Sequence, residues 1–366
     1  MPAITKVEIY KLNIPRQTQF RIAIGVFEEV QNILVRVHAN DGLYGLGEGA
    51  PLPFLCGETQ AIAFEASKTL ARLLIGRDPY AVEARMHELG SYLVHNTTAR
   101  SAFDMALYDL LGKRAGLPLY ALLGGEKRAL TTDETIGLDT PGAMAKEALE
   151  ARERGFAAVK VKLGTGFPDD VDRIRAIREA VGPETLLRID ANQGWDPVTA
   201  ERILQELARF DIQYCEEPVA HWNNQALRRV RDKSPIPIMA DESLFDHHDA
   251  FRLASMGACD YFNIKLAKSG GIHTALKIDA VAEAAGIQCM VGCMSETRLG
   301  LSAAAHLVSA RPNIVFADLD SAFGKADLVD GGITYHGGDI TLPDTPGHGA
   351  GIKEEVLASL ESCTIA

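Results

Sequence analysis

The stretch Ala157-Ala158-Val159-Lys160-Val161-Lys162-Leu163-Gly164 has the composition of a buried strand, yet it carries two lysines. Side chains two residues apart on a strand lie on one face, so the two ammonium groups are predicted to stand side by side. A neighbouring cation and partial desolvation both favour the neutral amine, which can accept a proton. The stretch therefore predicts one strand of a buried sheet and, on it, a candidate acid/base lysine.

Around this stretch, short apolar segments alternate with longer amphipathic ones, which is the pattern of βα units and a parallel sheet. Strands are predicted at 132–136, 157–162, 186–190, 213–215, 236–239, 261–264, 288–291 and 314–316. Helices are predicted between them at 141–154, 171–180, 198–208, 224–231, 248–254, 272–284 and 299–308. Eight strands over about 190 residues predict an α/β fold, a (β/α)7β modified TIM barrel. An open doubly wound sheet is the alternative, but no GxGxxG motif follows the first strand.

The first part of the chain has a different pattern. Strands are predicted at 4–12, 31–37 and 42–47, followed by helices at 58–74, 81–89 and 98–115. Strands followed by helices favour an α+β unit rather than a continuation of the barrel. We therefore predict an N-terminal α+β capping domain over residues 1–125, completed by the tail from about 331 to 366, and a barrel domain over 126–330.

Composition bounds the setting in which the protein works. A formal charge of -12 and a pI near 5.4 argue against nucleic-acid partners and against a basic membrane-binding surface. The six cysteines show no zinc-type pair of CxxC units, so free thiols in a reducing compartment are expected. No signal peptide or apolar membrane span is predicted. A cytoplasmic enzyme that forms homo-oligomers through exposed barrel helices is the expectation.

Charged residues follow five successive predicted strands. They are Lys162, Asp190, Glu216, Asp241 and Lys265, separated by 24 to 28 residues, and each step equals one βα unit. Because all barrel strands point the same way, these groups are predicted to meet at the carboxyl end of the barrel. The structural alternative is that the acids are helix N-caps. That explanation suits single acids better than three acids and two lysines in register.

The chemistry of this set is specific. Asp190, Glu216 and Asp241 would form an oxygen-only cage that suits a hard divalent ion, Mg²⁺ or Mn²⁺. Lys162 and Lys265 lie on different strands with the acids between them. A ligand held on the metal would therefore meet one amine on each of its two faces.

Five motifs resemble those of the enolase superfamily and, within it, the muconate-lactonizing subgroup. They are Lys-x-Lys at 160–162, Asp-Ala-Asn-Gln-Gly-Trp at 190–195, Glu-Glu-Pro at 216–218, Ala-Asp-Glu-Ser at 240–243 and Asn-Ile-Lys-Leu-Ala-Lys-Ser-Gly-Gly at 263–271. The resemblance covers nearly the whole chain, including the Gly-Glu-Gly-Ala-Pro segment at 47–51. It implies a capped modified barrel in which a lysine stands on each side of the site.

The resemblance also implies roles for individual residues. Asp190, Glu216 and Asp241 would bind Mg²⁺, and Lys162 and Lys265 would carry protons to and from the substrate α-carbon. The metal would neutralise the substrate carboxylate where charge develops. Around them, Lys160 would tune Lys162, Glu217 and Asn192 would support the ligands, and Glu242 would orient Lys265 or Asp241.

Asp318 and Asp320, at the end of the eighth predicted strand, indicate which reaction of the subgroup is catalysed. Two acids at this mouth would bind a free α-ammonium, as the Asp-x-Asp of dipeptide epimerases does, although an Asp that caps a loop is common. We therefore predict a dipeptide epimerase that transfers a proton at the α-carbon of the C-terminal residue. The alternatives are a muconate-type cycloisomerase, an o-succinylbenzoate synthase, an N-acylamino acid racemase and, more remotely, a non-catalytic metal-dependent binding protein.

Side-chain selectivity is expected from the loops at 18–30 and 51–58. The segment 20–25 resembles one that, in Ala-Glu epimerases, carries a carboxylate-binding arginine at the position of Ile24. An apolar second residue is therefore predicted, while Arg21 could substitute for that arginine and Glu28 or Glu29 could favour a basic side chain. Ser295 and Glu296 either line the site or, for Glu296, begin the next helix. Cys289 and Cys293 are interpreted as buried structural thiols rather than as a redox or zinc pair.

Overall fold

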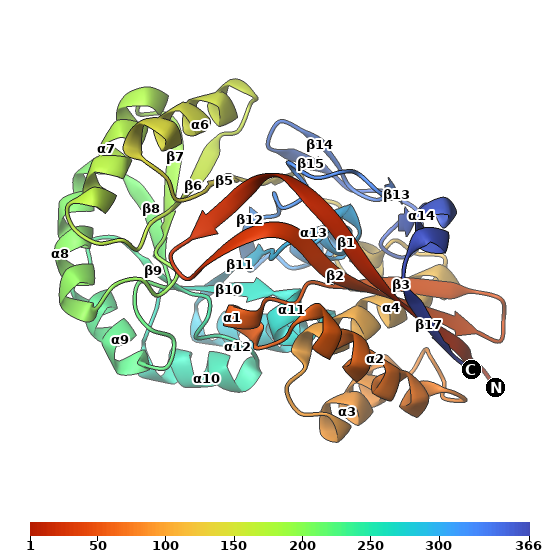
Figure 1. The fold of residues 1–366 in the computed structure, drawn as a ribbon. Coiled ribbons are helices and arrows are strands. Elements are labelled where there is room, and N and C mark those ends of the chain that lie inside the picture. Colours follow the sequence, from red (N-terminus) through yellow and green to blue (C-terminus); the bar gives the residue numbers. More distant parts are fainter.

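The computed structural model describes the backbone of residues 1–366 and the side chains of all except residues 16–19 and 27–28. In the described chain, eight parallel strands form one sheet in sequence order, which confirms the predicted barrel (Figure 1). They are β5 (Glu134–Ile136), β6 (Ala158–Lys162), β7 (Leu186–Asp190), β8 (Ile212–Glu216), β9 (Ile238–Ala240), β10 (Tyr261–Lys265), β11 (Gln288–Gly292) and β12 (Ile314–Asp318).

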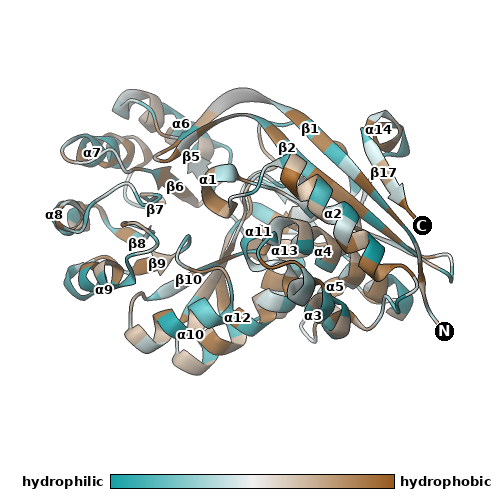
Figure 2. Cartoon of the chain, turned by 60° about the horizontal axis from the view of Figure 1, so that its bottom comes forward, coloured by the Kyte–Doolittle hydropathy of each residue, from teal (hydrophilic) through white to brown (hydrophobic). Residues whose placement is uncertain are grey.

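Helices surround this sheet. They are α6 (Pro141–Glu153), α7 (Asp169–Val181), α8 (Pro197–Leu207), α9 (Asn224–Lys233), α10 (His247–Met256), α11 (Leu266–Ser269), α12 (Ile272–Ala285) and α13 (Arg298–Ala310). Most carry both hydrophilic and hydrophobic residues (Figure 2), because one face packs on the barrel and the other meets solvent. Side-chain oxygens of Thr140, Asp196, Asn223, Asp246 and Thr297 cap the first turns of five of them. Among the described residues, no helix has the length and apolarity needed to span a bilayer.

The barrel is bridged by side chains where its first and last strands meet. Between β5 and β12 the described backbone forms no ladder, and the sheet order runs only from β12 through to β5. Instead, Asp320 Oδ2 accepts a hydrogen bond from Thr135 N at 2.6 Å, and Thr132 Oγ1 accepts one from Leu319 N at 2.8 Å. The seam therefore places Asp320 in a fixed position beside the barrel mouth.

The N-terminal part begins with a sheet in the order β17-β1-β2-β3. Its elements are β1 (Ile4–Ile22), β2 (Gly25–Ala39), β3 (Tyr44–Gly49), α1 (Pro53–Cys56), α2 (Gln60–Leu74), α3 (Val82–Tyr92), α4 (Thr97–Ala115) and α5 (Leu119–Leu122). As predicted, α4 ends at Ala115; its C-cap is Gly116, whose φ of 70° lies in the left-handed region that glycine tolerates. Helix α4 packs directly on β3, so closely that a Cβ at Gly47 would lie 1.9 Å from Ala102 O.

The predicted loop at 18–30 is instead the end of a long hairpin. Strands β1 and β2 pair from Ile4 opposite Ala39 to Ile22 opposite Gly25, with irregularities in register. The expectation of a loop was wrong because Pro15 and the polar residues after it resemble a turn in sequence, whereas residues 20–22 pair with residues 25–27 of β2. The hairpin reaches over the barrel (Figure 1), where Arg21 O accepts a hydrogen bond from Leu138 N at 2.8 Å.

Two carboxyl groups of the N-terminal part cap barrel helices. Glu48, between Gly47 and Gly49, accepts hydrogen bonds from Thr297 N at 2.9 Å and Gly300 N at 3.0 Å at the start of α13. Asp104 on α4 accepts hydrogen bonds from the first two backbone N–H groups of α12. These contacts satisfy helix N–H groups that would otherwise lack partners, and they fix the cap on the barrel.

The C-terminal tail contacts both parts. It contains β13 (Val329–Gly331), β14 (Thr334–His336), β15 (Asp339–Thr341), β16 (Ala350–Ile352), α14 (Glu354–Ser359) and β17 (Ser362–Ile365). Strand β17 pairs with β1, whereas β15 pairs with β4 (Leu130–Thr131) just before the barrel. The predicted division of the chain at residues 125 and 331 remains a prediction.

The contact of β3 with α4 predicts a steric effect on stability. Replacing Gly47 by Ala is expected to lower the free energy of unfolding by about 1–3 kcal/mol, because the backbones must separate to admit the Cβ. Denaturant unfolding measures this change. Gly142→Ala on α6 is the matched control, since a Cβ there meets nothing within 4 Å. Equal stability of the two variants would contradict the close approach.

Candidate active site

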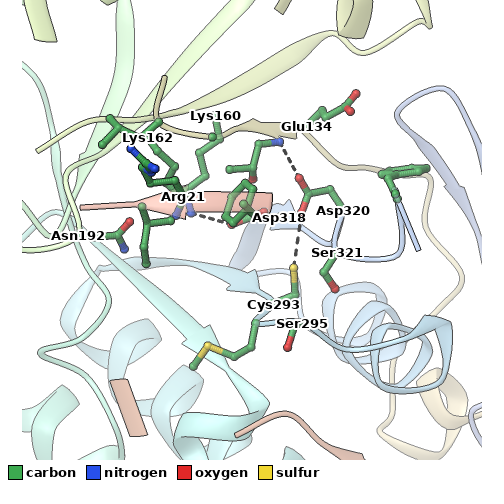
Figure 3. Close-up of a pocket in the computed structure, with 18 of the residues that line it drawn as sticks. Arg21, Glu134, Lys160, Lys162, Asn192, Cys293, Ser295, Asp318, Asp320 and Ser321 are labelled. Carbon is green, nitrogen blue, oxygen red and sulfur yellow. Dashed lines mark hydrogen bonds and ion pairs between the residues drawn. The ribbon is translucent and has the colours of Figure 1, made fainter. Parts of the chain in front are cut away.

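A cavity of about 910 Å³ lies where the barrel mouth meets the N-terminal part. Its floor includes Lys160, Lys162, Lys265, Asp318 and Asp320, all predicted from the sequence to act here (Figure 3). Its upper wall comes from the β1–β2 hairpin and from the segment around α1. The strand ends therefore meet at one cavity, as the spacing of the charged residues predicted.

Lys160 is at the centre of the buried charges. Its side chain is 1% exposed, and its Nζ lies 2.7 Å from Asp318 Oδ2, 2.8 Å from Glu216 Oε2 and 3.4 Å from Asp190 Oδ2. Burial alone would lower the pKa of Lys160, but these three acids outweigh it and raise the pKa well above its ordinary value. Lys160 thus joins the proposed metal ligands to the proposed ammonium site, a role that the sequence did not reveal.

The two candidate acid/base lysines lie against different carboxylates. Lys162 Nζ is 2.6 Å from Asp190 Oδ2, and Lys265 Nζ is 2.8 Å from Asp241 Oδ2. Burial opposes the charge on Lys265, yet the neighbouring acids Asp241 and Glu216 raise its pKa above the ordinary range. Both amines line the cavity, so a molecule inside it can contact either one.

The sequence analysis missed Lys268, a buried lysine one turn beyond Lys265. Its Nζ contacts Asp241 Oδ1 and donates to Asn263 O at 3.2 Å. Asn263 Nδ2 in turn donates to Glu216 Oε1 at 2.8 Å. The position of Lys268 on α11, the short helix that begins directly after Lys265 at the end of β10, was the available signal.

The chemistry of Asp190, Glu216 and Asp241 fits a hard divalent ion. All three carboxyl groups are completely buried, offer only oxygen, and come from the ends of β7, β8 and the segment after β9. Burial and the nearby Asp190 raise the pKa of Glu216 to about 8. In the structure, lysine ammonium groups lie between these acids and compensate part of their charge. A divalent cation among them would relieve the same crowding.

Strained backbone and buried polar side chains support the ligands. Asn192 and Glu217 adopt positive φ values of 40° and 32°, which are uncommon for residues other than glycine. Glu217 accepts hydrogen bonds from Asp241 N at 2.7 Å and Ser243 N at 3.2 Å, so it shapes the turn that presents Asp241. Glu242 Oε1 accepts a hydrogen bond from Asn192 Nδ2 at 3.2 Å. That Glu242 orients Lys265 or Asp241 remains a prediction.

Unpaired oxygens remain around this support. Within the described part of the chain, Glu242 Oε2 and Asn192 Oδ1 are buried and have no hydrogen-bond partner. Burial and nearby acids raise the pKa of Glu242 well above its ordinary value. Spare buried acceptors are costly unless a donor or cation joins them, which also fits a site that holds an ion.

Asp318 and Asp320 lie together at the other end of the cavity floor. Asp318 Oδ2 bonds Lys160, and Asp320 Oδ2 is held by Thr135 N. Cys293 Sγ lies 3.7 Å from Asp320 Oδ1 (Figure 3). The interpretation of Cys293 as a buried structural thiol was wrong, because the bend of the chain after β11 turns it to the cavity wall.

The residues proposed for selectivity divide into two groups. Arg21, Glu29 and Ser295 line the cavity. Ile24 lies at the hairpin turn and is not on the described cavity wall. Glu296 is not among the described residues that line the cavity; its Oε2 accepts a hydrogen bond from Met294 N at 2.7 Å, and it precedes the N-cap of α13. The side chain of Glu28 lies outside the described residues.

Comparisons with known proteins place this arrangement in a family. The model of the mandelate racemase / muconate lactonizing enzyme N-terminal domain matches residues 4–124, and that of the enolase C-terminal domain-like family matches residues 143–356. The chain belongs to the enolase superfamily. The resemblance of its motifs to this superfamily is thereby confirmed.

Similar curated proteins are epimerases. A hydrophobic dipeptide epimerase of Enterococcus faecalis is 43% identical over 334 residues, covering 90% of this chain and 94% of that protein. A D-Ala-D/L-Ala epimerase of Cytophaga hutchinsonii is 42% identical and covers 99% of both chains. The crystal structure of a dipeptide epimerase from C. hutchinsonii, complexed with Mg and D-Ala-L-Val, superposes with a TM-score of 0.98, 42% identity and full coverage of both chains.

The proposed cage predicts that Mg²⁺ stabilises the folded protein. An ion that binds only the folded state adds about 2.7 kcal/mol at one hundred times its Kd. Glu216→Gln is expected to weaken this effect at least about tenfold in Mg²⁺ concentration. Thermal unfolding during a Mg²⁺ titration measures it. Glu134→Gln, on the cavity wall outside the cage, is the control, and an unchanged response of Glu216→Gln would exclude the cage.

Proposed function

We propose that the protein is a Mg²⁺-dependent dipeptide epimerase that inverts the α-carbon of the C-terminal residue. The observation that carries this proposal is the position of Lys162 and Lys265, two amines that face one cavity from opposite sides of three buried carboxylates. Similar proteins that are dipeptide epimerases, at 41–43% identity, support it. Mn²⁺ offers the same preference for oxygen ligands and is the alternative ion.

In the proposed reaction, three acids bind the metal ion and two lysines transfer the protons. Asp190, Glu216 and Asp241 would hold the ion, which when bound supplies positive charge where the substrate carboxylate becomes more negative. Lys162 Nζ or Lys265 Nζ removes the α-proton from one face, and the other amine delivers a proton to the opposite face. Inversion follows because the two protons travel on opposite sides of the same carbon.

Asp318 and Asp320 favour a dipeptide, which carries a free α-ammonium, over other substrates of the superfamily. Asp318 and Asp320 would pair with the free α-ammonium, which places the C-terminal residue toward the two lysines. A dicarboxylate would be repelled by these acids, and an N-acylated amino acid would leave them without a cation. The cavity therefore suits epimerisation better than cycloisomerisation, dehydration or N-acylamino acid racemisation.

The upper wall favours an apolar second side chain. Ile22, Val30, Leu52, Leu55 and Met294 line the cavity, and Glu29 of the same hairpin lines it beside them. The charge of Glu29 would repel a substrate carboxylate side chain. Arg154, another cation of the wall, has its Nη2 2.5 Å from Glu134 Oε2, so its charge is already compensated. Arg21 lies exposed at the rim, where binding a carboxylate has little energetic advantage over water. Selectivity for a glutamate side chain is therefore not expected.

The two-base mechanism predicts a stereochemical difference between lysine variants. Lys162→Ala and Lys265→Ala are each expected to lose at least about 10²-fold in α-proton exchange from one epimer, because each removes one acid/base group. Exchange of the L,L and L,D dipeptides in D₂O, followed by NMR, measures it. Lys277→Ala, on the exposed side of α12, is the control. Full exchange of both epimers in both variants would leave only a binding role.

The apolar wall predicts a substrate preference. With Mg²⁺ in D₂O, dipeptides with Val, Leu or Tyr in second position are expected to exceed Ala-Glu at least about tenfold in kcat/KM, the usual scale of apolar pocket discrimination. A panel that includes cationic second residues tests this directly. Faster α-deuteration of Ala-Glu or of a cationic dipeptide than of every apolar one would overturn the preference.

A further inference from the structure

Cys293, Asp318 and Asp320 form a second cluster of potential metal ligands within the cavity. A sulfur or carboxylate oxygen from each lies within 4.8 Å of the other two. These three side chains converge from β12, the segment after it and the segment after β11, and all line the cavity (Figure 3). The cluster is therefore open to small molecules and ions that enter the site.

The two carboxyl groups are held in place by fixed partners. Lys160 Nζ holds Asp318 Oδ2 at 2.7 Å, and Thr135 N holds Asp320 Oδ2 at 2.6 Å. The second oxygen of Asp320, Oδ1, faces Cys293 Sγ at 3.7 Å. In a tetrahedral zinc site with usual bond lengths, a sulfur and an oxygen ligand lie about 3.6 Å apart. The spacing thus matches two ligands that share one ion.

We propose that Cys293, Asp318 and Asp320 form an inhibitory site for a borderline divalent metal, Zn²⁺ above all. The Cys293 thiol gives its proton to solvent as its sulfur binds the ion, and the thiol-to-carboxylate hydrogen bond is replaced by two metal bonds. Three protein ligands leave one position for water, a common arrangement for zinc.

The Cys293 thiolate gives this site a different metal preference from that of the proposed magnesium cage. Sulfur selects zinc and cobalt over magnesium, whereas Asp190, Glu216 and Asp241 offer only oxygen. Since Asp318 and Asp320 would otherwise receive the substrate ammonium, the ion would compete with the dipeptide rather than with Mg²⁺. This competition rests on the proposed function, but binding of the metal does not.

Cobalt binding tests the site without any turnover. Co²⁺ added to Mg²⁺-saturated protein is expected to produce a thiolate-to-cobalt charge-transfer band in the near ultraviolet, which Zn²⁺ removes. Cys293→Ser should abolish the band, and Asp320→Asn should weaken Co²⁺ binding at least about tenfold. Cys363→Ser, at a thiol on β17, is the matched control and should keep the band. A band that persists in Cys293→Ser, or no band in the wild type, would overturn the proposal.

Kinetics with added Zn²⁺ test whether the bound ion competes with the dipeptide. Zn²⁺ is expected to raise the KM for an apolar dipeptide without changing kcat, and more dipeptide rather than more Mg²⁺ should restore the rate. Cys293→Ser should require at least about tenfold more Zn²⁺ for the same ratio of KM values. Relief by Mg²⁺ alone would place zinc in the cage and refute the site. A cobalt band in a protein without epimerase activity would instead refute the proposed function and leave the metal site standing.

Discussion

The mutual compensation of buried charges at the barrel mouth is the constraint on which the rest of the site depends. Asp190, Glu216, Asp241 and Asp318 are almost entirely removed from water, and an unpaired charge there would cost several kcal/mol. The Lys160 ammonium group compensates the charge of three of them at once, because its Nζ lies 2.7 to 3.4 Å from their oxygens. The proposed metal cage and the proposed ammonium pocket are therefore joined by one side chain.

This coupling gives Lys160 a different meaning from the one its sequence position suggests. Beside Lys162 on one strand face, it was expected to lower the pKa of its neighbour by repulsion. In the structure its charge is held by acids on β7, β8 and β12, so much of its field is already compensated. Its main physical contribution is to reduce the repulsion among three buried acids, Asp190, Glu216 and Asp318, before an ion and a substrate arrive.

The barrel could be predicted from the sequence because each βα unit repeats the same local pattern. The charged residues at the strand ends could be predicted because they recur at the same place in each unit. The sequence was insufficient where position depends on contacts distant in sequence. Cys293 could not be assigned to the cavity, since only the approach of β12 brings Asp320 beside it. The hairpin over the mouth was likewise hidden, because its end forms by pairing of residues 20–22 with β2 rather than by local propensity.

Selectivity and chemistry are carried by separate parts that are nevertheless rigidly joined. The apolar wall belongs largely to the N-terminal part, while the lysines and acids belong to the barrel. Glu48 and Asp104 cap α13 and α12, and the β3–α4 contact leaves no room for a side chain at Gly47. A wall fixed in this way can change its side chains without moving the acids and lysines, because none of the capping contacts passes through them. Under the proposed function, that separation would let the side-chain preference change while the charged floor stays the same.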